Sequence, residues 1–188
     1  ASSGAVYGSG PKPFVETDPL LVNPQLGIYY ASKLSAELLV ESYASYFTTV
    51  ILRFFFIYGP GQREQMLIPR LVQSVMKGVP IKLQGNEGLR INPIFVTDAA
   101  QAVKAALDLT ESSKINVGGM ENLSLREIGQ TIAQCLNVEA KFEVVSETKP
   151  VDLIGDTERL CNLLVRPKVT FQEGVKVYLE SRDYCVKC

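Results

Sequence analysis

The 188-residue chain contains no histidine and no tryptophan. Without histidine it cannot form a Ser-His-Asp or Cys-His catalytic arrangement. A zinc site would also lack its common nitrogen ligand, so we expect no metal centre. Any catalytic chemistry must therefore use tyrosine, lysine, serine, threonine, cysteine or a carboxylate.

Cysteines are few and irregularly spaced. Cys135 and Cys161 stand alone, and only Cys185 and Cys188, in the closing "CVKC", are near each other. A thioredoxin-type motif should follow a strand rather than close a chain. We therefore interpret "CVKC" as a tail with two thiols, not as a redox or metal site.

Neither a charge excess nor a long apolar run is present. With 19 basic and 20 acidic residues, the net charge of −1 offers no field for nucleic acid or an anionic membrane. The apolar run at 50–59, "VILRFFFIYG", is interrupted by charge and is far shorter than the ~18–20 residues of a membrane span. No signal-peptide pattern opens the sequence. We expect a soluble, cytoplasmic protein without nucleic-acid or membrane partners.

Strand and helix patterns alternate along the chain. Residues 48–59, "TTVILRFFFIYG", are β-branched and aromatic, which is typical of a strand buried on both faces of a parallel sheet. Helical spacing extends over 27–46, and a second helix at 64–78 should end at Gly78. This alternation predicts the α/β class.

Two further helices have recognisable start signals. Ser124 with Glu127, and Thr170 with Glu173, have the spacing of a capping box, in which each side chain bonds the other residue's backbone N–H. We therefore expect helices to begin at these two positions.

The stretch "GIYYASKLSAELL" at 27–39 is the candidate chemical centre. Residues four apart lie on one helix face, so the Tyr29 phenol and the Lys33 ammonium can share a partner. A nearby cation favours the phenolate, which can act as a base. The spacing alone also fits an exposed lysine beside a core tyrosine. Ser2 and Ser3, upstream, offer hydroxyls at a strand end.

Five segments carry a resemblance. In order, "SSGAVYG", "YYASK", "LRFFFIYGPGQ", "LRINPIFVTDAAQAV" and "INVGGMENLSLREI" resemble the extended short-chain dehydrogenase/reductase superfamily, in its NAD-dependent nucleotide-sugar epimerase/dehydratase branch. The resemblance implies the C-terminal portion of a Rossmann-like parallel sheet with a small α/β substrate-binding lobe. Residues 1–60 would hold a partial Rossmann portion with the catalytic residues. Residues 61–188 would hold the substrate lobe and the remaining Rossmann elements.

The resemblance also implies residue roles. Ser3 matches the catalytic serine, Tyr29 the catalytic tyrosine, and Lys33 the lysine that favours the phenolate and bonds the nicotinamide ribose. In such enzymes the tyrosinate removes a sugar hydroxyl proton while NAD accepts a hydride from the same carbon. Phe55 matches an aromatic residue beside the cofactor, and a core strand residue is the equal alternative.

Substrate contacts are implied at three positions. Arg90 matches an arginine that contacts the nucleotide diphosphate; the alternative is a solvated loop charge. Lys149 and Asp152, in "KPVD", match an Arg-Pro-Gly-Asp motif whose arginine meets phosphate and whose aspartate meets a ribose. Lys149 carries a compact ammonium, whereas arginine presents a planar fork of N–H donors, so the contact of Lys149 with phosphate would be less directional.

The sequence departs from the family pattern in three places. Phe56 replaces an asparagine that reaches the substrate phosphates, and Gly4-Ala5 replaces the acid/base pair of dehydratases, which favours epimerase or reductase chemistry. No G-x-G-x-x-G lies between a strand and a helix. We therefore expect the dinucleotide-binding segment, on the order of 100 residues, to be missing. We would then expect self-association as a dimer, either through the open sheet edge or through the helix that carries Tyr29 and Lys33.

Three functions follow. The first is NAD- or NADP-dependent chemistry on a nucleotide-sugar through transient oxidation of a hydroxyl. The second is a non-catalytic remnant that binds a nucleotide or a protein partner. The third is a carbonyl reductase, which Phe56 favours by making the pocket more apolar.

Overall fold

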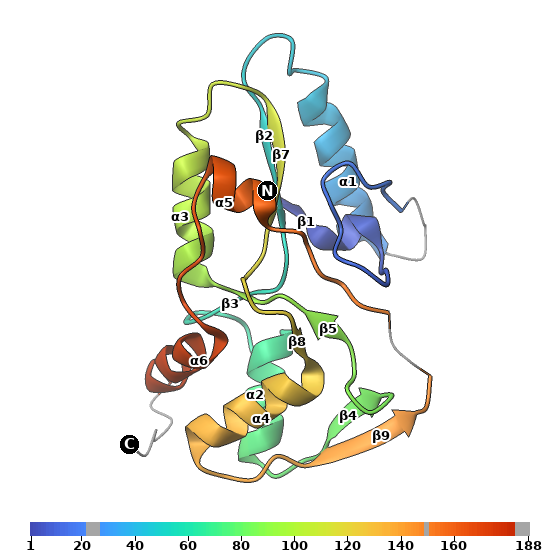
Figure 1. The fold of residues 1–188 in the computed structure, drawn as a ribbon, viewed down its shortest axis with the longest axis vertical. Helices are drawn as coiled ribbons and strands as arrows, with labels where there is room; N and C mark the ends of the chain where they lie inside the picture. Colours follow the sequence, from blue (N-terminus) through green and yellow to red (C-terminus); the bar gives the residue numbers. More distant parts are fainter. Residues whose placement is uncertain (22–26, 149–150, 183–188) are drawn as a thin grey trace.

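The computed structural model describes residues 1–21, 27–148 and 151–182. Lys149, Cys185 and Cys188 lie outside these ranges. The described chain is α/β, as predicted, with a parallel sheet and a smaller lobe below it in Figure 1. The assignment of residues 1–60 and 61–188 to separate portions stays a prediction.

The sheet has three parallel strands in the order β1-β2-β7. They are β1 (Ser2–Ser3), β2 (Val50–Phe54) and β7 (Ser113–Val117). A short 3-10 helix, η1 (Gly4–Tyr7), follows β1 directly. The prediction of a buried parallel strand is confirmed for β2.

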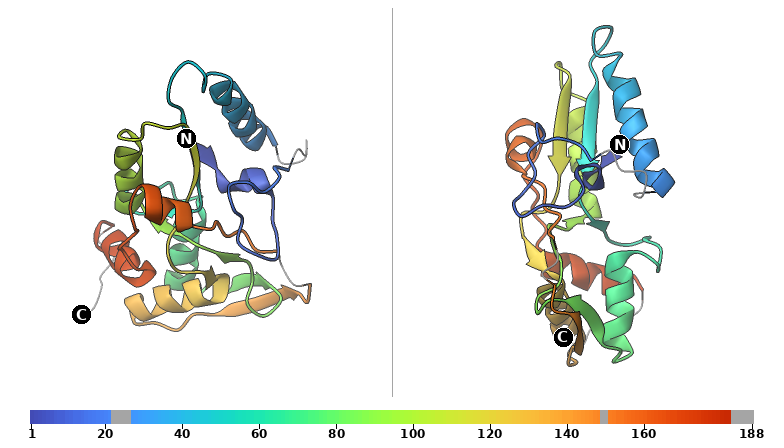
Figure 2. Two further views of the ribbon diagram at one scale, coloured as in Figure 1. Left: turned by 45° about the horizontal axis from the view of Figure 1, so that its top comes forward. Right: turned by 90° about the vertical axis from the view of Figure 1, so that its right-hand side faces the viewer.

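Helices cover both faces of this sheet. Helix α1 (Gly27–Glu41) lies on one side, and α3 (Val96–Ala106) and α5 (Glu158–Leu163) lie on the other (Figure 2). Leu52 of β2 faces the α3 side, within a core formed with α3 alanines and Leu160 of α5. Because side chains alternate along a strand, the next residue, Arg53, points to the α1 side.

The prediction of one continuous strand through 59 is wrong. Phe56 has φ +47°, a left-handed conformation that ends β2. Ile57–Tyr58 form a separate strand, β3, which pairs in parallel with β6 (Ile94–Phe95). This break carries the chain out of the sheet and toward the lobe.

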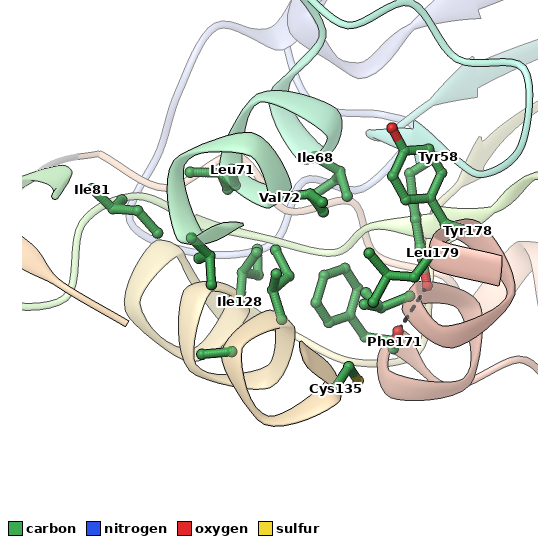
Figure 3. Packing of buried hydrophobic residues seen from close by; sticks show 14 of the residues in the cluster. Tyr58, Ile68, Leu71, Val72, Ile81, Ile128, Cys135, Phe171, Tyr178 and Leu179 are labelled. Atoms are coloured by element: carbon green, nitrogen blue, oxygen red, sulfur yellow. Dashed lines mark hydrogen bonds between the residues drawn. The ribbon is translucent and has the colours of Figure 1, made fainter. Parts of the chain in front are cut away.

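The lobe contains two short strand pairs and three helices. Strand β4 (Ile81–Gln84) pairs in parallel with β9 (Phe142–Ser146), and β5 (Arg90–Ile91) pairs antiparallel with β8 (Leu123–Ser124). The helices are α2 (Leu67–Met76), α4 (Leu125–Leu136) and α6 (Phe171–Glu180). Figure 3 shows their shared core, in which Tyr58 donates a hydrogen bond to the Phe171 carbonyl.

The start signals of α4 and α6 are confirmed, since both capping boxes form. In each box, hydrogen bonds from the cap lower the pKa of the glutamate carboxyl. Gly78, at φ +63°, follows the end of α2 as expected. Helix α1, however, ends at Glu41 rather than at 46, because residues beyond it form i to i+3 turns, such as Ala44 N–H to Glu41 O.

A buried ion pair attaches α1 to the sheet. Glu37 is the only buried residue of α1, at 3% exposure, and it accepts hydrogen bonds from the Arg53 Nε and Nη2 atoms. The Nη2 bond to Glu37 Oε2 is 2.7 Å long. Most apolar side chains of α1 face outward. The rotation of α1 on the sheet is therefore set by a charge pair more than by apolar packing.

A polar network surrounds the guanidinium. Arg53 Nη1 donates to the Tyr7 hydroxyl and to the Glu16 carbonyl, and Tyr7 donates to Asn116 Oδ1. Burial acts to lower the pKa of Arg53, but the bonds to Glu37 and Tyr7 outweigh it, so that pKa lies above its ordinary value. Burial raises the pKa of Tyr7 despite the adjacent cation, so its phenol stays a neutral donor.

We predict that Glu37→Gln lowers the free energy of unfolding by about 3–5 kcal/mol, because Arg53 is left buried without a counter-charge. Urea denaturation measures this. The control is Glu41→Gln, one turn further along, which removes the half-exposed pair with Lys114 and should cost less than about 1 kcal/mol. Equal losses for the two variants would contradict the structural role of Glu37.

Candidate active site

A cavity of about 810 Å³ opens where the sheet meets the lobe. Its wall includes β1 and the start of η1, the first turn of α1, the link from β2 to β3, the loop at 59–62 and the N-terminus of α2. The carboxyl ends of β1 and β2 contribute to this wall, and in open α/β sheets ligands bind at that edge. The cavity is therefore the candidate active site.

Ser3 and Tyr29 both line this cavity, and Lys33 lies beside Tyr29. The Lys33 Nζ is 5.7 Å from the centre of the Tyr29 ring, and it donates a 3.2 Å hydrogen bond to the Ala1 carbonyl. Tyr29 remains 55% exposed. The structure thus brings the three predicted catalytic residues together around one end of the cavity.

The cavity wall offers hydroxyl groups that can bond a substrate. The Ser3 Oγ accepts a hydrogen bond from the Ala5 N–H at 3.3 Å, which leaves its own proton for donation. The neighbouring Tyr30 also lines the cavity, with its ring edge against Tyr29 at 5.2 Å between centres. The arrangement therefore presents a phenol and a hydroxyl on the wall of one cavity, with a cation beside the phenol.

Phe55 is both a core residue and a wall residue. It is 1% exposed and packs with Val6 and Tyr7, yet it contributes to the cavity. Its ring lies between Gly4 and Gly155, where an added Cβ would come within 2.4 and 2.5 Å of ring atoms. Both glycines are therefore required for the ring to sit there, and its contact with a cofactor stays a prediction.

Arg90 and Asp152 lie together but outside this cavity wall. The Arg90 backbone N–H donates to the Asp152 carboxylate at 3.0 Å. The Arg90 guanidinium bonds the Asn122 carbonyl at 2.9 Å and pairs with Glu127 at 3.2 Å. Asp152 is followed by Leu153, which does line the cavity. The predicted nucleotide contact of Lys149 falls outside the described residues.

Two buried polar atoms at the cavity were not predicted. Within the described ranges, Ser2 Oγ and Gln62 Oε1 have no hydrogen-bond partner, and both residues line the cavity. Buried polar atoms without partners are rare in folded proteins, so each is a candidate ligand contact. Ser2 and Gln62 both stand in segments that the sequence analysis singled out, "SSGAVYG" and "GPGQ". Within those two segments, however, only Ser3 was predicted to have a role at the site.

Two other kinds of feature are absent from the same ranges. No described helix is long and apolar enough to cross a membrane. Among those residues, no group of three or more acidic or cysteine side chains is placed to hold a metal ion.

Known sequences resemble the chain throughout. The dTDP-4-dehydro-6-deoxyglucose reductase of Escherichia coli is 30% identical over 190 residues, which cover 96% of this chain and 59% of that protein. The UDP-glucuronate 4-epimerase of Thermodesulfobacterium geofontis is 29% identical, with coverage of 94% and 56%. The chain thus spans less than two thirds of the length of these relatives.

Solved structures agree with this resemblance. UDP-glucuronic acid 4-epimerase from Bacillus cereus, in complex with UDP-glucuronic acid and NAD, superposes with a TM-score of 0.81 at 25% identity, over 96% of this chain and 59% of that one. The dTDP-glucose 4,6-dehydratase of Bacillus anthracis, in complex with NAD, gives 0.81 at 26% identity, with coverage of 97% and 60%. Residues 1–118 match the sequence profile of the NAD dependent epimerase/dehydratase family. The chain therefore belongs to the NAD dependent epimerase/dehydratase family.

Proposed function

We propose that this chain carries the proton-handling and substrate-binding residues of an NAD(P)-dependent enzyme that acts on a nucleotide-sugar by transient oxidation of a sugar hydroxyl. The observation that carries the proposal is that Ser3 and Tyr29 line one cavity and that Lys33 lies beside Tyr29. A cytoplasmic location belongs to the same proposal.

Each residue has a distinct task in the reaction. The Tyr29 phenolate takes the proton of the sugar hydroxyl as the oxygen becomes a carbonyl. The Ser3 hydroxyl donates a hydrogen bond to that oxygen and stabilises the negative charge that develops on it. Lys33, whose ammonium lies 5.7 Å from the centre of the Tyr29 ring, would bond the nicotinamide ribose. The return of the proton from Tyr29 completes the cycle.

When bound, a nicotinamide cofactor would supply the complementary chemistry, which is the removal and return of a hydride at the carbon that bears the hydroxyl. The described residues suit that end of the cofactor. Ser3 and Tyr29 line the same cavity as Gly4, which packs against the Phe55 ring, and Lys33 lies beside Tyr29. These residues would hold the nicotinamide and its ribose.

The nucleotide diphosphate has two sets of contacts in the proposal. The N-terminus of α2 receives no side-chain cap from its N-cap residue, Met66, and Leu67 and Ile68 line the cavity. Backbone N–H groups at a helix N-terminus suit phosphate oxygens. Arg90, Lys149 and Asp152 would bind the outer part of the nucleotide.

We predict that Tyr29→Phe lowers epimer formation by about 100-fold or more, because the proton acceptor is lost. Tyr30→Phe is the matched control and should change the rate only a few-fold. The assay incubates the protein with NAD and UDP- or GDP-sugars and separates the epimers. Equal effects of the two substitutions would contradict the assignment of Tyr29.

A non-catalytic remnant is the first alternative, and thermal melting separates it from the enzyme. Under the proposal, NAD at millimolar concentration raises the melting temperature, since a ligand that binds only the folded state stabilises it. If Lys33→Met abolishes this rise in melting temperature, NAD binds beside Lys33. Stabilisation by a nucleotide-sugar but never by NAD would favour the remnant.

A carbonyl reductase is a second alternative, and one observation favours it. The cavity wall near the catalytic end is mainly aromatic and aliphatic, with Phe54, Phe55 and Phe56 in sequence along it. A small apolar aldehyde would suit such a wall. Oxidation of NADPH by simple aldehydes, without any turnover of nucleotide-sugars, would support this reading against the main one.

Self-association is part of the proposal. Helix α1 and the turns after it expose an apolar stripe formed by Ile28, Leu39, Tyr43, Tyr46 and Phe47. Ile28 and Leu39 are eleven residues apart and so lie on one side of α1, and Tyr43, Tyr46 and Phe47 lie in the turns that follow it. Exposed apolar surfaces of this kind are typical of protein interfaces. We propose that two copies pair through this α1 stripe.

We predict that sedimentation velocity at about 10 µM shows a dimer, because the stripe is too apolar to remain in water. Leu39→Lys places a charge at its centre and should yield a monomer. Lys82→Glu, on an exposed position of β4, is a control that should leave the dimer intact. A monomeric wild-type chain at this concentration would contradict the proposal.

A further inference from the structure

The side-chain amide of Gln62 is held in one orientation at the cavity. Its Nε2 donates a 2.8 Å hydrogen bond to the Ile57 carbonyl, and both residues line the cavity. The amide oxygen cannot take that place, because two carbonyl oxygens would then face each other without a proton between them. The bond to Ile57 therefore directs Oε1 of Gln62 away from Ile57.

The amide oxygen of Gln62 has an unused acceptor position. Oε1 is buried and has no hydrogen-bond partner within the described ranges. A buried oxygen without a donor is rare in folded proteins and costs free energy until a donor reaches it. Because Gln62 lines the cavity, a molecule that binds there can supply this donor.

The loop that carries Gln62 is packed at its start and open near its end. An added Cβ at Gly59 would come within 2.6 Å of the Val96 side chain, whereas at Gly61 it would have no atom within 4 Å. Gly61 directly precedes Gln62 and has φ +81°, a conformation that glycine adopts at no steric cost. A small shift at Gly61 can therefore bring Oε1 to a donor in the cavity.

A residue far along the chain holds the backbone of the same loop. Arg182 Nη2 donates a 2.8 Å hydrogen bond to the Gln62 backbone carbonyl, and Nη1 lies 3.7 Å from the Glu64 carboxylate. The guanidinium also lies over the Tyr178 ring, 5.8 Å from its centre. Since Arg182 follows α6, the end of this helix is connected to the cavity wall. Gln62 is thus held through its side chain by Ile57 and through its backbone by Arg182.

We infer that Gln62 is a further substrate-binding residue, whose Oε1 accepts a hydrogen bond from a neutral donor of the nucleotide-sugar, and that Arg182 is its positioning residue. An amide oxygen only accepts, so it pairs with an N–H or O–H group and not with an ionised phosphate oxygen. The uridine part and the sugar part of a UDP-sugar both carry such donors. The inference rests on the proposed function and names a binding residue of that same site.

Isothermal titration calorimetry with Gln62→Met tests the contact. Methionine has a similar length but offers no strong acceptor. We expect the variant to bind UDP-glucose about three- to tenfold more weakly, as the loss of one hydrogen bond requires. An equal loss for UDP would place the donor on the uridine part, and a loss for UDP-glucose alone would place it on the sugar. Gln84→Met, at an exposed position of β4 outside the cavity wall, is the control and should bind both ligands normally.

A second variant separates the ligand contact from the bond to Ile57. Gln62→Glu loses the donor to Ile57 but keeps an acceptor oxygen, so it should retain most of the affinity for UDP-glucose. If it binds as weakly as Gln62→Met, the bond to Ile57 explains the loss and the inference is overturned. Unchanged affinity in Gln62→Met would also overturn the inference, and would leave the proposed function intact. Absence of binding of UDP-glucose and dTDP-glucose by the wild-type chain would overturn both.

A double-mutant cycle tests the positioning role of Arg182. Arg182→Met removes the bond to the Gln62 carbonyl and should weaken the binding of UDP-glucose about threefold. In a Gln62→Met background it should cause little further loss, because Arg182 acts through Gln62. Glu64→Gln removes only the 3.7 Å ion pair and should keep the wild-type affinity. Thermal melting shows that each variant is folded. Full additivity of the two substitutions would show that Arg182 does not position Gln62.

Discussion

The buried pair between Glu37 and Arg53 is the interaction on which the candidate site depends. Tyr29, Lys33 and Glu37 are spaced four residues apart, so they lie along one side of α1. Fixing Glu37 against β2 therefore directs Tyr29 toward the cavity and Lys33 toward the first strand, where its ammonium bonds the Ala1 carbonyl. A helix with its apolar residues exposed would otherwise have little to fix its rotation on the sheet.

The same network also reaches the rest of the site. Arg53 bonds Tyr7, which follows Ser3 through η1, and Tyr7 bonds Asn116 of β7. All three strands of the sheet and the helix with Tyr29 are thus connected through one guanidinium. Each of the three guanidinium nitrogens has a hydrogen-bond partner, which offsets the cost of burying this charge and makes the loss of one partner expensive.

Local signals in the sequence predicted local structure well. The capping boxes at Ser124 and Thr170 were predictable because a helix start depends on residues three apart. The break at Phe56 was not, because an apolar run gives no sign of a left-handed backbone. The same limit applies to Glu37, since its partner Arg53 is distant in sequence and a glutamate on a helix usually faces water.

The candidate site followed a similar division. Ser3, Tyr29 and Lys33 were predictable from their order and spacing, and the structure places them together. The unpaired oxygens of Ser2 and Gln62 could not be predicted, because burial of single atoms depends on how the sheet and the lobe meet.

Hydrogen exchange of the α1 backbone amides tests the central claim most directly. If the Glu37 pair holds α1 on the sheet, Glu37→Gln should raise the exchange rates of amides in residues 27–41 by about 100-fold, as a local opening about 3 kcal/mol easier requires. Amides of β2 and β7 should change much less. Unchanged exchange in α1, or an equal increase throughout the sheet, would contradict the account.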